Sequence, residues 1–104
     1  DDFNEMCMGH RDVYLKEKAL NYYRRFFYDT AVNGHTAALQ CGRAFAGIDQ
    51  MVFATDMPFD NQKGRRLIRD TIASVEQMGL NAEEKAKLYR NNAINLLRLP
   101  LCAV

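Results

Sequence analysis

Apolar side chains recur every three to four positions, among charged neighbours, in three stretches of this chain. This spacing predicts amphipathic helices over residues 12–25, 36–46 and 65–78, because positions three and four apart share one face of a helix. Thr36 is placed to cap the second helix, and Gly47 is placed to end it, since glycine readily adopts the left-handed conformation that follows a helix. The limits of the second helix are therefore marked at both ends.

A further helical stretch follows towards the end of the chain. Asn81 and Glu84 have the spacing of a capping box, in which each side chain accepts a hydrogen bond from the other residue's backbone N–H. The pair Asn91–Asn92 is expected to interrupt this helix, which resumes over residues 93–99. Pro100 ends the regular structure, because proline cannot donate a backbone hydrogen bond.

Two short stretches have the composition of buried strands. Residues 26–30, FFYDT, combine aromatic and β-branched side chains, and residues 51–55, MVFAT, form a nearly continuous apolar run. About twenty residues with a predicted helix separate them, which fits a parallel crossover and is too long for a hairpin. The sequence therefore predicts an α/β fold: two parallel strands joined by a crossover helix and followed by C-terminal helices.

Composition narrows the classes of function. Lys and Arg number 14 against 13 Asp and Glu, so the net charge of +1 does not favour nucleic acid or an anionic membrane as a partner. No apolar run approaches the ~18 residues that span a bilayer, and the acidic start is unlike a signal peptide. Cys7, Cys41 and Cys102 are widely spaced and suggest neither a disulfide framework nor a zinc ribbon. Reduced thiols in a cytoplasmic protein are the expectation.

The candidate functional residues follow from where the strands end. In parallel α/β folds, ligands bind beyond the carboxyl ends of the strands. Asp56 follows the second predicted strand, and Asn33 and His35 lie in the loop after the first, where they are candidates for contacting a substrate. For His35 the alternative is a polar loop residue beside a helix start.

Two acidic residues end these strands and allow different interpretations. Asp56 is either a carboxylate kept at a buried strand end to meet a cation or hydrogen-bond donors, or a residue that caps the following Met-Pro-Phe turn through its own backbone. Asp29 is better explained as a turn residue whose side chain accepts a hydrogen bond from the backbone nearby.

Three motifs, in this order, resemble a known family. They are FFYDTAVNG at residues 26–34, MVFATDMPFD at residues 51–60 and NNAINLLRL at residues 91–99. Together they resemble the last part of the amidohydrolase-related proteins, in the branch of the aminocarboxymuconate-semialdehyde, dihydroxybenzoate and resorcylate decarboxylases. The apolar strand followed by T-D-x-P-F is the most specific of the three motifs.

The resemblance implies a (β/α)₈ barrel of the TIM type, with residues 26–30 and 51–55 as strands seven and eight. It implies that Asp56 is the strand-eight metal carboxylate, which contacts a divalent ion, usually zinc, and orients or deprotonates the metal-bound water. Zinc lowers the pKa of its water to ~7, so a nearby carboxylate can accept the proton at neutral pH. The family's H-x-H pair and its further histidines have no counterpart here, although a catalytic zinc needs about three protein ligands.

Residues 1–104 are therefore expected to form one segment, the C-terminal part of an amidohydrolase-type barrel, which is inactive alone. The start without methionine fits a piece of a longer chain. The remainder of the barrel or a homo-oligomer is expected to cover the exposed strand edges. The leading hypothesis is a segment of a metal-dependent hydrolase or decarboxylase for a small carboxylate or aromatic substrate. The alternative is a non-catalytic module that serves packing or oligomerisation.

Overall fold

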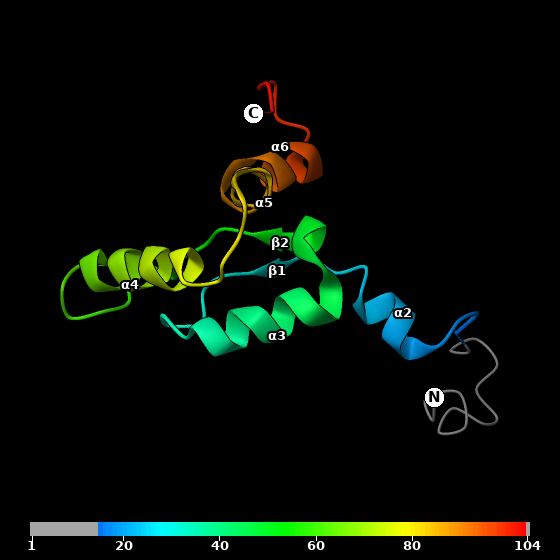
Figure 1. The fold of residues 1–104 in the computed structure, drawn as a ribbon, viewed down its shortest axis with the longest axis horizontal. Coiled ribbons are helices and arrows are strands. Elements are labelled where there is room, and N and C mark those ends of the chain that lie inside the picture. The colour runs from blue at the N-terminus through cyan, green and yellow to red at the C-terminus, as the bar shows by residue number, and fades with distance from the viewer. Residues whose placement is uncertain (1–14, 104) are drawn as a thin grey trace.

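Two parallel strands lie at the centre of the computed structural model, which describes residues 15–103 (Figure 1). Strand β1 (Tyr28–Asp29) pairs with strand β2 (Met51–Val52), and the first residues of the two strands lie opposite each other. Because the strands are parallel, both carboxyl ends lie at the same end of the pair. The predicted parallel pairing is confirmed.

The connection between the strands is the predicted crossover. Helix α3 (Thr36–Ala46) is followed by Gly47, whose positive φ of 87° is not helical and ends the helix. The 3₁₀ turn η2 (Ile48–Gln50) then leads into β2. In α3, His35 rather than Thr36 occupies the N-cap position, and its side chain makes no capping hydrogen bond. The prediction of Thr36 as the cap was therefore wrong by one residue, because the chain is still extended at His35, with φ −94° and ψ 97°.

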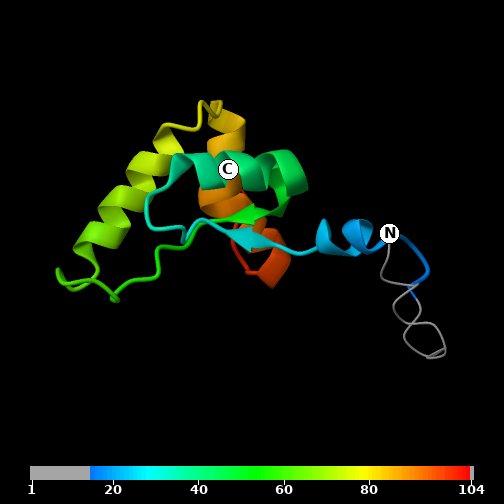
Figure 2. The same cartoon turned by 90° about the horizontal axis from the view of Figure 1, so that it is seen from below.

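The remaining elements are helical. Seen as in Figure 1, α3 lies below the strand pair and helix α5 (Ala82–Ala86) lies above it. In the view from below in Figure 2, both helices lie above the strands. In chain order these elements are α2 (Ala19–Tyr23), α4 (Arg65–Glu76), α5 (Ala82–Ala86), the π-helical turn η3 (Lys87–Asn91) and α6 (Asn92–Leu97). Helix α2 is shorter than the predicted helix over residues 12–25, of which 12–14 lie outside the described residues.

One apolar core joins the helices to the strands. Its members come from α3, β2, α4, the α4–α5 connection and η3, so segments distant in sequence exclude water together. The buried residues of this core are Leu39, Met51, Val75, Met78, Leu80 and Leu88. The tilted rings of Phe53 and Tyr89, with centroids 5.1 Å apart, extend it beyond the end of β2.

The strands are shorter than the predicted residues 26–30 and 51–55: β1 begins at Tyr28, and both strands end early where a side chain replaces the backbone ladder. The N–H of Thr30 donates to the carbonyl of Val52 at 3.1 Å, which is the last backbone hydrogen bond of the pair. The Thr30 hydroxyl then donates to the Ala54 carbonyl at 2.7 Å and accepts from the Ala54 N–H at 3.0 Å. Thr30 is fully buried, so its hydroxyl holds the two chains together beyond the strand ends.

Asn91 and Asn92 do not interrupt the C-terminal helix, contrary to the prediction. The helix widens into the π-helical turn η3 and continues directly into α6. The buried side chain of Asn92 donates at 2.8 Å to the carbonyl of Ile48, in η2, and at 2.7 Å to the carbonyl of Met51, the first residue of β2. Asn92 thus ties the last helix to the amino end of the sheet.

The predicted capping box is confirmed at the start of α5. The Asn81 carboxamide oxygen accepts from the Glu84 N–H at 2.9 Å, and the Glu84 carboxylate accepts from the Asn81 N–H at 3.3 Å. Glu84 also pairs with Arg43 of α3 at 2.7 Å, which connects the capped helix to the crossover helix. The same carboxylate therefore serves local structure and tertiary packing.

Replacing Thr30 by valine should destabilise the protein by about 2 kcal/mol, because both Ala54 backbone groups lose their hydrogen-bond partner. Urea unfolding followed by circular dichroism measures the change. Thr71→Val is the matched control, since the Thr71 hydroxyl is buried and has no hydrogen-bond partner in the described part of the chain. The control should stay within about 0.5 kcal/mol of the parent. Equal effects of both variants would contradict the role of Thr30.

Candidate functional site

The carboxyl ends of β1 and β2 lead into two loops that form the candidate site. The loop after β1 carries Asn33 and His35, and the loop after β2 carries Asp56. Thr30 joins the two segments at their bases through its paired hydrogen bonds to Ala54. The predicted candidates therefore belong to neighbouring loops at one end of the sheet.

Asp56 is exposed, and its backbone lies in the left-handed region with φ 62°. Its carbonyl accepts from the Phe59 N–H at 3.2 Å, across a turn that contains the cis Met57–Pro58 peptide. The side chain that accepts from this turn is the Thr55 hydroxyl, which the Met57 N–H approaches at 3.3 Å. The Asp56 carboxylate itself makes no hydrogen bond or ion pair with any residue between 15 and 103.

The turn role that one of the two interpretations expects of Asp56 is present in its backbone but not in its side chain. Its backbone closes the turn, but its carboxylate does not cap it. The left-handed backbone is one that aspartate tolerates better than most residues other than glycine and asparagine. A carboxylate at a strand end, held out to solvent, is accessible to a cation or another ligand.

Asp60 holds the loop in place, and its role in this loop was not predicted. One carboxylate oxygen accepts from the N–H groups of Gln62 and Gly64 at 2.7 and 2.8 Å. The other accepts from the N–H of Leu67, in the first turn of α4, at 2.9 Å. Because Gly64 at the N-cap has no side chain, Asp60 supplies the cap of α4 from outside the helix.

The hydrogen bonds to Asp60 also affect its protonation. Partial removal from water would raise the pKa of this carboxyl group, but the N–H groups of Leu67, Gly64 and Gln62, with the charge of Arg66, outweigh it. The pKa of Asp60 is therefore lowered from its ordinary value of 3.8. Asp60 is thus a charged anchor for the loop at neutral pH.

Asn33 is held by a residue from another part of the chain. Its carboxamide oxygen accepts from the Arg66 guanidinium of α4 at 2.9 Å. Arg66 also approaches Asp70 at 3.7 Å, so it links the loop after β1 to α4. The close approach continues at Gly34, where an added Cβ would lie 3.0 Å from the Asp70 Cβ. Asn33 therefore has a structural contact in addition to its predicted place near the site.

His35 and Asp29 occupy the ends of this first loop. His35 is exposed, and its carbonyl accepts from the N–H groups of Ala38 and Leu39, which starts α3. The Asp29 carboxylate accepts from the Ala31 N–H at 2.9 Å, so the expected turn role of Asp29 is confirmed. Of the two strand-end acids, Asp56 is the one with a disengaged carboxylate.

Comparison with known proteins assigns the chain to a family. A model of the amidohydrolase family matches residues 2–99, nearly the whole chain, and the chain therefore belongs to this family. Membership implies the superfamily of TIM barrels, and β1, α3 and β2 form one parallel unit of the kind from which such barrels are built. No curated protein and no solved structure matches the chain. No helix within residues 15–103 has the length and apolar character to span a membrane.

The described residues do not provide a complete metal centre. The family usually binds divalent metals, yet residues 15–103 bring together no group of three His, Cys, Asp or Glu side chains that could hold an ion. A zinc site needs three or four protein ligands. Residues 15–103 therefore do not by themselves bring together the ligands that a zinc site needs.

The pH dependence of stability tests the anchoring role of Asp60. A lowered pKa in the folded state means that the carboxylate stabilises the fold above its ordinary pKa of 3.8, and this contribution is lost as the pH falls further. Asp60→Asn should lower the urea midpoint at about pH 6, and its difference from the parent should shrink by about pH 3. Asp29→Asn, which keeps a side-chain acceptor for one N–H, is the control and should change little. A difference that stays constant with pH would contradict the anchoring role.

Zinc titration tests whether the ligand set is incomplete. The 104-residue chain should bind zinc more weakly than about 10 μM, because residues 15–103 bring together no set of three ligands. Competition with a chromophoric chelator measures this affinity, and Asp56→Asn shows whether any weak binding involves the candidate carboxylate. Micromolar or tighter binding by the unaltered chain would contradict the prediction.

Proposed function

We propose that this chain provides one metal carboxylate, Asp56, to a metal-dependent hydrolase or non-oxidative decarboxylase of the amidohydrolase family. The observation that carries the proposal is the Asp56 carboxylate, which is exposed at the carboxyl end of a parallel sheet and makes no hydrogen bond or ion pair with residues 15–103. Active sites of barrels of this type lie at that end of the strands. Family membership supports the hydrolase-like class.

The loop around Asp56 supports a role that requires a defined position. Asp60 fixes the end of the loop through three backbone N–H groups, and Thr30 fixes its beginning through Ala54. A carboxylate between two anchored points loses little conformational freedom when it meets a ligand, which favours precise chemistry. In the proposal, Asp56 is a metal ligand and the proton acceptor.

Two residues of the loop after β1 are proposed to contact the substrate. The exposed side chain of His35 is available for this role. The Asn33 oxygen is engaged by Arg66, so its amide nitrogen is the group that remains to donate to a substrate. A small carboxylate or aromatic compound is the proposed substrate, and a divalent metal, with zinc as first choice, is the proposed cofactor. The proposed location is the cytoplasm.

The remaining ligands are proposed to come from other strands of the barrel, with homo-oligomerisation as a further source of contacts. Apolar surface in the described residues supports such association. Phe59 is 79% exposed, and Leu97 is 64% exposed, so burying these side chains would be favourable. A non-catalytic packing module is the second candidate, favoured by the lack of a three-ligand group in residues 15–103.

Substitution of Asp56 distinguishes the two candidates. In the complete enzyme that contains this chain, Asp56→Ala should lower metal-dependent turnover by at least about 10³-fold while the enzyme stays folded. The carboxylate has no hydrogen-bond partner within residues 15–103, and alanine in the left-handed backbone at φ 62° should cost only about 1 kcal/mol of stability. Asp29→Asn is the matched control at the neighbouring strand end and should retain activity, since asparagine keeps the acceptor for Ala31. Retained turnover in Asp56→Ala would rule out the catalytic assignment.

A further inference from the structure

A cavity lies at the opposite end of the sheet from Asp56. It has a volume of about 280 Å³ and is formed by residues that precede the two strands and by the C-terminal helix. Phe27 lies just before β1, Asp49 lies just before β2, and Lys87 belongs to η3. The volume is near the lower limit of pockets that hold small molecules, about 300–1,000 Å³.

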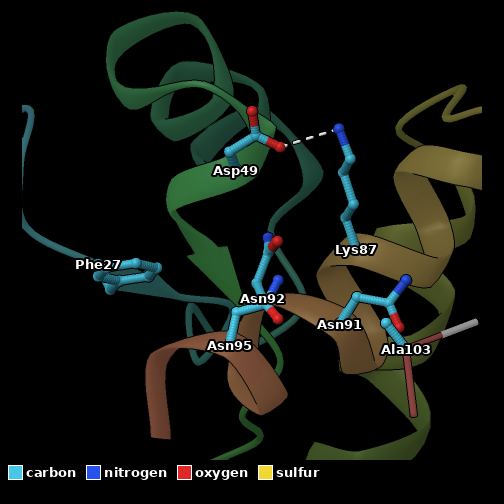
Figure 3. Close-up of a pocket in the computed structure, with 7 residues that line it drawn as sticks. All are labelled: Phe27, Asp49, Lys87, Asn91, Asn92, Asn95 and Ala103. Carbon is cyan, nitrogen blue, oxygen red and sulfur yellow. Dashed lines mark ion pairs between the residues drawn. The ribbon is translucent and has the colours of Figure 1, made fainter. Parts of the chain in front are cut away.

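The π-helical turn brings several polar side chains to this cavity. In a regular helix, consecutive residues point about 100° apart, yet Asn91 and Asn92 both line the cavity together with Asn95. Such wide turns are rare and recur at functional sites. Figure 3 shows Phe27 on one side of the cavity, Lys87 on the other and the asparagines between them.

The charges around the cavity are balanced internally. Lys87 pairs with Asp49 at 3.0 Å and with Glu83 at 3.5 Å (Figure 3 shows the pair with Asp49). The hydrogen bond and the charge of Asp49 raise the pKa of Lys87, so the ammonium group stays charged and committed to this partner. An anionic ligand would have to compete with two carboxylates, and a cationic one would have to displace Lys87.

From these contacts we infer that the cavity binds a small, uncharged, polyhydroxylated ring compound of monosaccharide size. Carboxamides donate and accept hydrogen bonds at once, which suits hydroxyl groups. The Phe27 ring, 38% exposed, offers an apolar face for the C–H surface of such a ring. The amide nitrogen of Asn92 is already used by Ile48 and Met51, so this side chain is held rigidly and offers its oxygen as acceptor.

Ligand-observed saturation-transfer NMR on the 104-residue chain tests this inference with D-glucose, D-galactose and myo-inositol. At least one probe should give a saturable signal with a Kd of about 1–10 mM, and D-glucose 6-phosphate should bind at least about tenfold more weakly than D-glucose. Absence of a saturable signal from all three neutral probes would overturn the inference, as would tighter binding of the phosphate.

Two pairs of variants locate the binding. Phe27→Ala and Asn95→Ala should each reduce affinity about tenfold, whereas Phe59→Ala and Asn61→Ala, which change the same residue types elsewhere, should leave it unchanged. Circular dichroism confirms that each variant is folded, and the exposed Asn95 can be replaced without altering the core. Equal losses in the cavity variants and their controls would overturn the assignment. Asp56→Ala should not affect this binding, so its outcome is separable from that of the proposed enzyme function.

Discussion

The structure depends on the parallel junction between β1 and β2, and above all on the hydroxyl of Thr30. Backbone pairing covers only two residues of each strand, and Thr30 extends it by acting towards Ala54 as both donor and acceptor. A buried hydroxyl that satisfies two backbone groups is worth more than an exposed one, since each group would otherwise remain unpaired. This junction places the loops after both strands side by side and defines the end of the sheet at which Asp56 lies.

In the loop that carries Asp56, one aspartate anchors the backbone and another keeps its carboxylate exposed. Asp60 performs the structural task by accepting from three backbone N–H groups and capping α4. Thr55 supplies the acceptor for the turn itself, which leaves the carboxylate of Asp56 outside the hydrogen bonding of its own loop. The structural acid, Asp60, and the disengaged acid, Asp56, are thus only four residues apart in the sequence.

The helices were predicted better than the strands, for a physical reason. The periodicity of α3 and α4 and the capping box at Asn81 depend on residues three or four apart, and both helices and the box are present. The strand limits depend on a partner chain, and side-chain bonding by Thr30 ends the backbone ladder early. The π-helical turn likewise reflects packing, because Asn92 is drawn towards carbonyls more than forty residues away.

The sequence by itself determined the parallel crossover and the position of Asp56 close after a strand. It also determined the resemblance to the amidohydrolase-related proteins, which the family match supports at the level of the family. These features follow from local spacing and from a short motif. Only the tertiary structure decided what each polar side chain does. Asn33 is held by Arg66 from thirty-three residues away, and Asp60 anchors a helix. The Asp56 carboxylate makes no hydrogen bond or ion pair within residues 15–103. Hydrogen bonds between distant segments depend on how those segments pack, and no local pattern of residues contains that information.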